Sequence, residues 1–266
     1  MEAAVAHFTG NRNGVYVKIM SELVEFKTSS LEGKKIVAVG AHPDDLEFGA
    51  GGTLIKLSGT NNVITVVVTD GGMGTHNEED EIGIAKIRLK ENRDAAKMMG
   101  IGRDIYWSYP DLSLENYKRS FQKRMVKLLL SVRPDVVMTF DPWGRYEPLL
   151  HPDHRTVAWG VVEAVLKSTL PKYLKRHGFM NKFLPSKPQV WLMAPGEANV
   201  GVDITSVWER KWEVISIHKS QFDSKAIYEN LKKRLTVEWF GKQGKGIGVD
   251  YAETFRILEY SGERAA

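Results

Sequence analysis

The chain has 266 residues, of which 42% are hydrophobic and 26% charged, the composition of an ordinary folded protein. It contains no cysteine, which excludes disulfides, thiolate metal sites and cysteine nucleophiles. The formal net charge is only +4, with lysine and arginine spread along the chain. We therefore expect no nucleic-acid partner, because nucleic-acid binders carry a basic stripe or a reader motif.

The longest strongly apolar run, residues 63–68, has the length of a strand, so we expect no membrane span. Residues 1–10 do not read as a secretory signal, and we expect a cytoplasmic protein. A chain of this length buries a full core without a structural metal, so a bound metal would be catalytic. We expect one domain over residues 1–266, with residues 1–33 as an N-terminal extension.

Strands and helices alternate along the chain. In chain order we expect a strand at 35–41, a helix at 51–57, a strand at 63–69, an acidic loop at 73–81, a helix at 84–99, a strand at 104–107, a helix at 116–131, a strand at 135–140, a helix at 153–166, strands at 189–194 and 200–204, and helices at 208–217 and 225–240. This alternation predicts an α/β fold: a Rossmann-like, mostly parallel sheet with helices on both faces, in a single domain.

Two loops that follow buried strands are rich in histidine and aspartate. His42 and Asp45 follow the first strand, and His151 and His154 follow the strand at 135–140. Ligands bind beyond the carboxyl ends of parallel strands, and catalytic zinc takes three ligands from histidine and carboxylate side chains. Either segment alone is more typical of a helix-capping turn, but the pair favours a metal site. These residue types leave His151 and His154 interchangeable as the third ligand.

A family resemblance runs from about Lys35 to about Phe255. It is carried by Ala41-His42-Pro43-Asp44-Asp45, Glu47-x-Gly49-x-Gly51-Gly52 and His151-Pro152-Asp153-His154, with smaller marks at Thr69-Asp70-Gly71, Arg88-x-x-Glu91, His218-x-Ser220-Gln221 and Glu253-x-Phe255. These motifs resemble those of the LmbE-like, or PIG-L, de-N-acetylases. The archaeal diacetylchitobiose deacetylases are the branch that the chain resembles most in character.

The resemblance implies a role for each of several residues in a hydrolytic site. His42, Asp45 and His154 look like the ligands of one Zn²⁺, although the same donor set accepts other divalent ions. Asp44 looks like the general base. His151 looks like the group that stabilises the oxyanion, and Asp153 like its orienting partner.

Four further residues are candidates for contacts with the substrate. Arg88 is similar to a substrate-gripping arginine, and Asp111 is expected to meet sugar hydroxyls. Trp143 can stack on a sugar ring or anchor its loop. His218 can be a packed histidine or an active-site residue, in its own or a neighbouring subunit. Some family members carry a tyrosine where this chain has Leu149, with Tyr146 nearby.

The resemblance implies a hydrolase that removes acetyl from an N-acetylglucosamine unit of a small saccharide such as diacetylchitobiose. One alternative is an amidase of the same machinery that acts on a thiol conjugate or another N-acyl glycoside. The other is a metal-free sugar-binding protein. The relatives also suggest a homo-oligomer, with a hexamer as one form.

Overall fold

The computed structural model describes residues 23–74, 81–144, 150–179, 182–222 and 224–258. Its strands are β1 (Val24–Glu25), β2 (Lys35–Gly40), β3 (Asn62–Thr69), β4 (Arg103–Tyr109), β5 (Val136–Phe140), β6 (Gln189–Met193), β7 (Val200–Asp203) and β8 (Ala252–Leu258). Its α-helices are α1 (Asp45–Ser58), α2 (Glu81–Met98), α3 (Lys118–Val132), α4 (Pro152–Ser168), α5 (Pro171–Arg176), α6 (Trp208–Ile215), α7 (Lys225–Leu235) and α8 (Gly241–Ile247). A π-helical turn, η6 (Thr236–Phe240), joins α7 to α8.

The strands form one sheet in the order β1-β7-β8-β6-β5-β2-β3-β4. The five strands from β6 to β4 are parallel, whereas β8 runs antiparallel between β6 and β7. The expected α/β fold with a mostly parallel sheet is confirmed. Part of the expected N-terminal extension belongs to the sheet, because β1 pairs with β7 and Leu31 is buried in the core.

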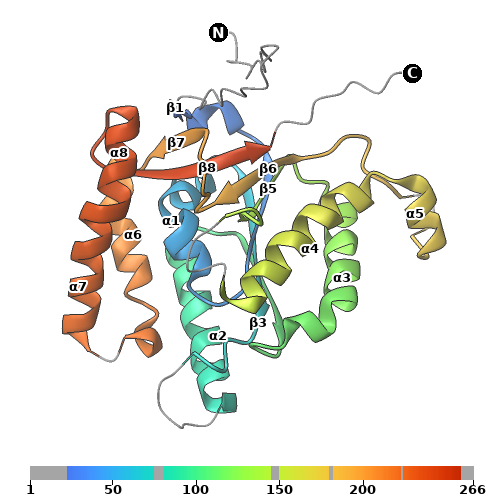
Figure 1. The fold of residues 1–266 in the computed structure, drawn as a ribbon, viewed down its shortest axis with the longest axis horizontal. Helices are drawn as coiled ribbons and strands as arrows, with labels where there is room; N and C mark the ends of the chain where they lie inside the picture. The colour runs from blue at the N-terminus through green and yellow to red at the C-terminus, as the bar shows by residue number, and fades with distance from the viewer. Residues whose placement is uncertain (1–22, 75–80, 145–149, 180–181, 223, 259–266) are drawn as a thin grey trace, which may run out of the picture.

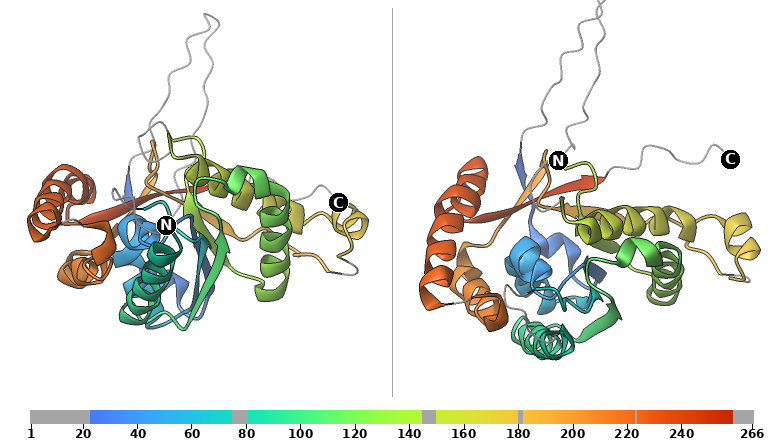
Figure 2. Two further views of the ribbon diagram at one scale, coloured as in Figure 1. Left: turned by 90° about the horizontal axis from the view of Figure 1, so that it is seen from below. Right: turned by 60° about the horizontal axis from the view of Figure 1, so that its bottom comes forward.

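The helices cover both faces of the sheet (Figure 1). Helix α4 packs against β2 and β5 with α3 beside it, while α1, α2 and α6 lie on the other side. Figure 2 shows α6–α8 and α3–α4 at opposite ends of the molecule, with α1 and α2 between them. The chain leaves β2 through α1 toward β3, and later returns through α3 to β5 on the other side of β2. The crevice between the ends of β2 and β5 is thus the switch point where ligands bind in such sheets.

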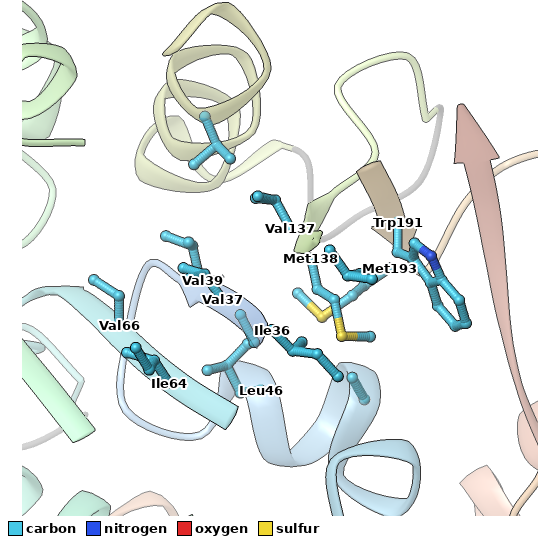
Figure 3. Close-up of a cluster of buried hydrophobic side chains, with 14 of the residues drawn as sticks. Ile36, Val37, Val39, Leu46, Ile64, Val66, Val137, Met138, Trp191 and Met193 are labelled. Atoms are coloured by element: carbon cyan, nitrogen blue, oxygen red, sulfur yellow. The ribbon is translucent and has the colours of Figure 1, made fainter. Parts of the chain in front are cut away.

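The central strands are buried along almost their whole length because helices cover both faces. Figure 3 shows side chains of β2, β3, β5 and β6 packed beside Leu46 of α1. Gly40 ends β2, and a Cβ placed there would lie 3.1 Å from Cβ of Asp45. The glycine therefore allows α1 to begin directly against the strand end, which brings Asp45 over the crevice.

Several element boundaries differ from the sequence prediction. Helix α1 begins at Asp45, six residues before the expected start. The sequence prediction placed the start too late because the glycines at 49, 51 and 52 have a low helix propensity. The expected helix at 225–240 is α7 followed by η6, and β8 was not predicted. None of the helices in the described residues has the length and apolarity needed to cross a membrane.

Candidate active site

Asp45 is the first residue of α1, and its carboxylate turns back over the loop that follows β2. Its Oδ2 accepts hydrogen bonds from the backbone N–H groups of Ala41 (2.8 Å) and His42 (2.6 Å). Its Oδ1 lies 3.2 Å from Nε2 of His154. The backbone therefore fixes one oxygen while the other faces the loop after β5.

The two ring nitrogens of His42 face different groups. Nδ1 lies 3.0 Å from Nε2 of His154 and 3.5 Å from Oδ2 of Asp45. Nε2 lies 3.1 Å from Oδ1 of Asp111 and 3.4 Å from Oδ2 of Asp153. A histidine that binds a metal commonly donates its other ring N–H to a carboxylate. The geometry therefore points Nε2–H at the two aspartates and directs Nδ1 toward His154 and Asp45, the arrangement expected of a metal-binding histidine.

The spacing of these groups fits a zinc ion. Zinc bonds of about 2.0–2.1 Å in a tetrahedron separate neighbouring ligand atoms by roughly 3.3 Å. Nδ1 of His42 and Nε2 of His154 lie 3.0 Å apart, and each approaches a different oxygen of Asp45, at 3.5 Å (Oδ2) and 3.2 Å (Oδ1) respectively. Ring nitrogens of His42, His151 and His154 also lie within 4.8 Å of one another, so His151 stands beside the same point.

His42, Asp111 and Asp153 form a second group with the spacing of a metal site. The carboxylate of Asp153 is completely buried and accepts backbone N–H groups of Leu112 (2.7 Å) and Leu114 (3.1 Å). Asp111 is also buried, and its Oδ1 accepts from the N–H of Leu112 (2.8 Å). Both carboxylates are already engaged by the backbone after β4, so this group is better suited to orient His42 than to hold an ion.

The electrostatics of the loop favour a positive charge at the point where the predicted ligands meet. Burial lowers the pKa of His42, but hydrogen bonds to Asp111, Asp153 and Asp45 outweigh it and raise the pKa well above its ordinary value. Burial would raise the pKa of Asp45, yet His154 and His42 hold it well below the usual range. A divalent cation would satisfy the same carboxylates with both histidines neutral.

Asp44, the residue before α1, has a strained backbone. Its φ of +103° lies in a region that residues other than glycine rarely adopt and that commonly marks functional sites. Burial raises the pKa of its carboxyl to about 6, with the charge of Arg88 opposing the shift. Oδ2 of Asp44 lies 3.3 Å from Nη2 of Arg88, which fixes its direction.

Arg88 projects from α2 and is only 3% exposed. Its Nη1 donates to the carbonyl of Gly71 (2.9 Å) and its Nη2 to the carbonyl of Pro43 (2.7 Å). A Cβ on Gly74 would lie 1.9 Å from Nη1, so a glycine there makes room for the guanidinium. Arg88 thus ties the Asp44 loop to the loop after β3, and the expected grip on substrate stays a prediction.

His151 caps the N-terminus of α4. Its Nδ1 accepts the backbone N–H of Asp153 (3.3 Å), which places the proton of a neutral ring on Nε2. Burial lowers the pKa of His151, as do the nearby His42 and His154. Asp153 therefore reaches His151 through its backbone, whereas its carboxylate reaches His42.

Comparisons with known proteins identify the family of the chain. The family model described as GlcNAc-PI de-N-acetylase (PIG-L) matches residues 37–165. The chain is 31% identical over 229 residues to the diacetylchitobiose deacetylase of Thermococcus kodakarensis, and the match covers 85% of this chain and 83% of that protein. The chain belongs to the PIG-L family. Its membership of this family supports a deacetylase activity.

Solved structures extend the comparison. The chain superposes on the N,N'-diacetylchitobiose deacetylase of Pyrococcus horikoshii with a TM-score of 0.78 and 35% identity, over 91% of this chain and 90% of that one. A hydratase of Pseudomonas putida, acting on 4-carboxy-2-hydroxymuconate, shares the fold with a TM-score of 0.68 at 19% identity, over 88% of this chain and all of that one. The second match shows the fold alone, because one fold hosts different reactions.

His218 of this PIG-L protein is completely buried within its own chain. Its Nε2 lies 3.5 Å from Oε1 of Glu47, and neither ring nitrogen makes a hydrogen bond within the described residues. Burial lowers its pKa, but Glu47 and then Asp44 outweigh this and raise it. An active-site role for His218 stays a prediction. The residue lies close enough to Asp44 of its own chain for the charge of Asp44 to raise its pKa.

Trp143 lies in the turn after β5 and is 47% exposed. Its ring packs edge-on against Trp159 of α4, with a centroid distance of 5.1 Å. The structure therefore shows a loop anchor, and stacking on a sugar stays a prediction. Tyr146 and Leu149 lie outside the described residues.

Sequence reasoning missed a buried ion pair behind α1. Nζ of Lys211 donates to Oε1 of Glu253 (2.6 Å) and to the backbone carbonyls of residues 47 and 48 (2.8 Å each). The Glu253 carboxylate accepts the backbone N–H groups of residues 52 and 53, at 2.8 and 2.7 Å. The pair thus bonds to helix backbone directly behind the Asp44–Asp45 turn. The available signal was helical periodicity, which puts Lys211 on the apolar stripe of Trp208, Trp212 and Ile215.

Proposed function

We propose that the chain is a zinc-dependent hydrolase that removes the acetyl group from an N-acetylglucosamine unit of a small saccharide such as diacetylchitobiose. One observation carries the proposal: Nδ1 of His42, Nε2 of His154 and the Asp45 carboxylate meet at 3.0–3.5 Å, with Nε2 of His42 facing two aspartates. The saccharide class is supported by the two diacetylchitobiose deacetylases that match most of the chain.

His42, Asp45 and His154 hold the metal in this proposal. A zinc ion with three protein ligands supplies an acidified water and polarises the amide carbonyl. Asp111 and Asp153 keep the His42 ring in place, because their oxygens face its Nε2.

Asp44 is the proposed general base. It takes a proton from the attacking water and passes it to the amide nitrogen as the carbon–nitrogen bond breaks. A base works best with a pKa near the operating pH, and burial raises that of Asp44 to about 6. Arg88 positions the carboxylate through the 3.3 Å contact with Oδ2.

His151 is the proposed donor to the oxyanion. With Nδ1 accepting the N–H of Asp153, neutral His151 carries its proton on Nε2, and this N–H donates a hydrogen bond to the carbonyl oxygen as negative charge develops there. Its lowered pKa keeps the ring neutral before the reaction.

Four further residues are proposed substrate contacts: Arg88, Asp111, Trp143 and His218. Trp143 is the most exposed of them, whereas Arg88, Asp111 and His218 are buried. We also propose a homo-oligomeric assembly, with the hexamer as the first form to test by light scattering.

Acetate release tests the proposed function. Zinc-loaded protein is incubated with N-acetylglucosamine, diacetylchitobiose and N-acetylglucosaminides of malate and inositol, and free acetate and free amine are measured together. We expect release in equal amounts, fastest from diacetylchitobiose. Release from a malate or inositol conjugate alone would instead support the alternative enzyme, which acts on another N-acyl glycoside.

Elemental analysis distinguishes the two enzyme hypotheses from the hypothesis of a metal-free sugar-binding protein. Protein purified without chelators is expected to hold about one zinc per chain. Sugar binding with neither metal nor acetate release, even after zinc addition, would refute the proposal.

A further inference from the structure

A cavity of about 570 Å³ opens beside two of the proposed metal ligands, Asp45 and His154. Phe48 in the first turn of α1 lines it on one side, and the segment α7–η6–α8 lines it on the other. Asp44 and His151 are absent from its described lining. The cavity therefore meets the metal site on a different side from the base and the oxyanion donor.

The C-terminal segment supplies an apolar wall. Leu231, Leu235, Trp239 and Phe240 line the cavity, and the last two belong to the π-helical turn η6. Such turns are rare and occur frequently at functional sites. Trp239 lines the cavity and keeps 38% of its surface exposed.

Most polar groups of the lining are already paired within the protein. The Glu253 carboxylate is bonded to Lys211 and to the backbone of α1. With its amide oriented to satisfy its neighbours, Gln243 accepts from Oγ1 of Thr254 (3.1 Å) and Nε1 of Trp239 (2.9 Å). Arg234 is exposed to solvent at the edge. A sugar would replace few of its hydrogen bonds to water against this wall, whereas an aliphatic chain would gain by burial.

We propose that this cavity is an acyl pocket, which accepts the hydrocarbon chain of N-acyl amino sugars whose acyl group is longer than acetyl. The inference rests on the proposed function, which puts the reacting carbonyl against Asp45 and His154. That carbonyl carbon bears the nitrogen on one side and the acyl chain on the other. With the nitrogen toward Asp44, which returns the proton to it, the chain points into the cavity.

The chemistry is the same as for acetyl. Water adds to the carbonyl carbon, the carbon–nitrogen bond breaks, the hydroxyl stays on the acyl carbon as a carboxylic acid, and the proton goes to the amine nitrogen. Only the binding of the chain differs, and each buried methylene strengthens binding by roughly fourfold at most.

Chain-length specificity tests the pocket. The value of kcat/KM is measured for glucosamine carrying acetyl, butyryl, hexanoyl or octanoyl groups. We expect the hexanoyl substrate to equal or exceed acetyl in the wild-type protein. Leu231→Trp fills the cavity and should lower the hexanoyl-to-acetyl ratio by about tenfold or more. If that variant does not fold, Leu235→Phe narrows the same wall.

Val237→Trp is the matched control, because Val237 lies in η6 within the same helical segment, is 64% exposed and is not among the lining residues. It should leave the ratio unchanged. A ratio that falls equally in Val237→Trp and Leu231→Trp would overturn the pocket.

Binding without turnover gives a second readout. In chelator-treated protein, calorimetry should show N-hexanoylglucosamine binding about tenfold more tightly than N-acetylglucosamine, and Leu231→Trp should remove the difference. Hydrolysis of acetyl alone, with equal affinities, overturns the acyl pocket and leaves the proposed function standing. No hydrolysis of any substrate refutes the proposed function, while the binding difference still decides the pocket.

Discussion

Two parts of the molecule surround the same site and differ in composition. The loops after β2, β4 and β5 contribute His42, Asp44, Asp111 and His151. Nε2 of His42 lies 3.1 Å from Oδ1 of Asp111, and the His42 ring packs edge-on against His151. The C-terminal part, α6 to β8, contributes the buried Lys211–Glu253 ion pair and an apolar wall. The parallel strand ends gather the reactive groups, while the C-terminal part supports α1 from behind. Substitutions in the first part should change chemistry, and those in the second should change stability or selectivity.

The largest effect is expected from His154→Ala, which removes a proposed metal ligand. Zinc per chain should fall well below one, and kcat/KM should fall by roughly 10³-fold or more. Elemental analysis and acetate release measure the two effects. His177→Ala is the control, since His177 is exposed and stacks on Tyr173 of α5. Full metal content in His154→Ala would contradict the ligand assignment.

The next effect is expected from Asp44→Asn. Loss of the base should lower kcat by about 10²–10⁴-fold, while the zinc content stays that of the wild type. Asp45→Asn is the matched neighbour and should lose metal as well as activity, because Asp45 faces both histidines. A near-normal rate in Asp44→Asn would remove Asp44 from the mechanism.

Lys211→Met tests the C-terminal part. Removing one partner of a buried ion pair typically costs about 3–5 kcal/mol of folding stability, because the other charge remains buried. Here the Glu253 carboxylate would lose its cation. Urea unfolding should show this loss, and Lys211→Met combined with Glu253→Gln should recover part of it. A double variant less stable than the sum of the single changes would contradict the coupling.

The smallest effect is expected from Trp143→Ala. Loss of a stacking face for the sugar should raise KM by about 3- to 10-fold with little change in kcat. Trp159→Ala distinguishes the two roles, because Trp159 holds Trp143 edge-on in its loop. If Trp159→Ala raises KM by the same factor, Trp143 acts as a loop anchor.

The fold was largely predictable because its central strands are continuous apolar runs separated by amphipathic helices. The six expected strands correspond to β2 through β7. Strand β8 was missed because its sequence, AETFRIL, mixes polar and apolar residues without a clean alternation. The start of α1 was missed because tertiary bonds from Lys211 and Glu253 stabilise a helix that its glycines disfavour.

The residue types at the ends of the buried strands can be read from the sequence alone, and they make His42, Asp45 and one of two later histidines candidates for one metal. The structure was needed to show that β2 and β5 are neighbours, which places the two loops across one crevice. It also showed that His42 turns Nε2 to Asp111 and Asp153, that Arg88 holds Asp44, and that Asp45 and His154 open onto an apolar cavity. The reason is physical: strand order and the facing of side chains depend on contacts between residues far apart in the chain, which no local pattern encodes.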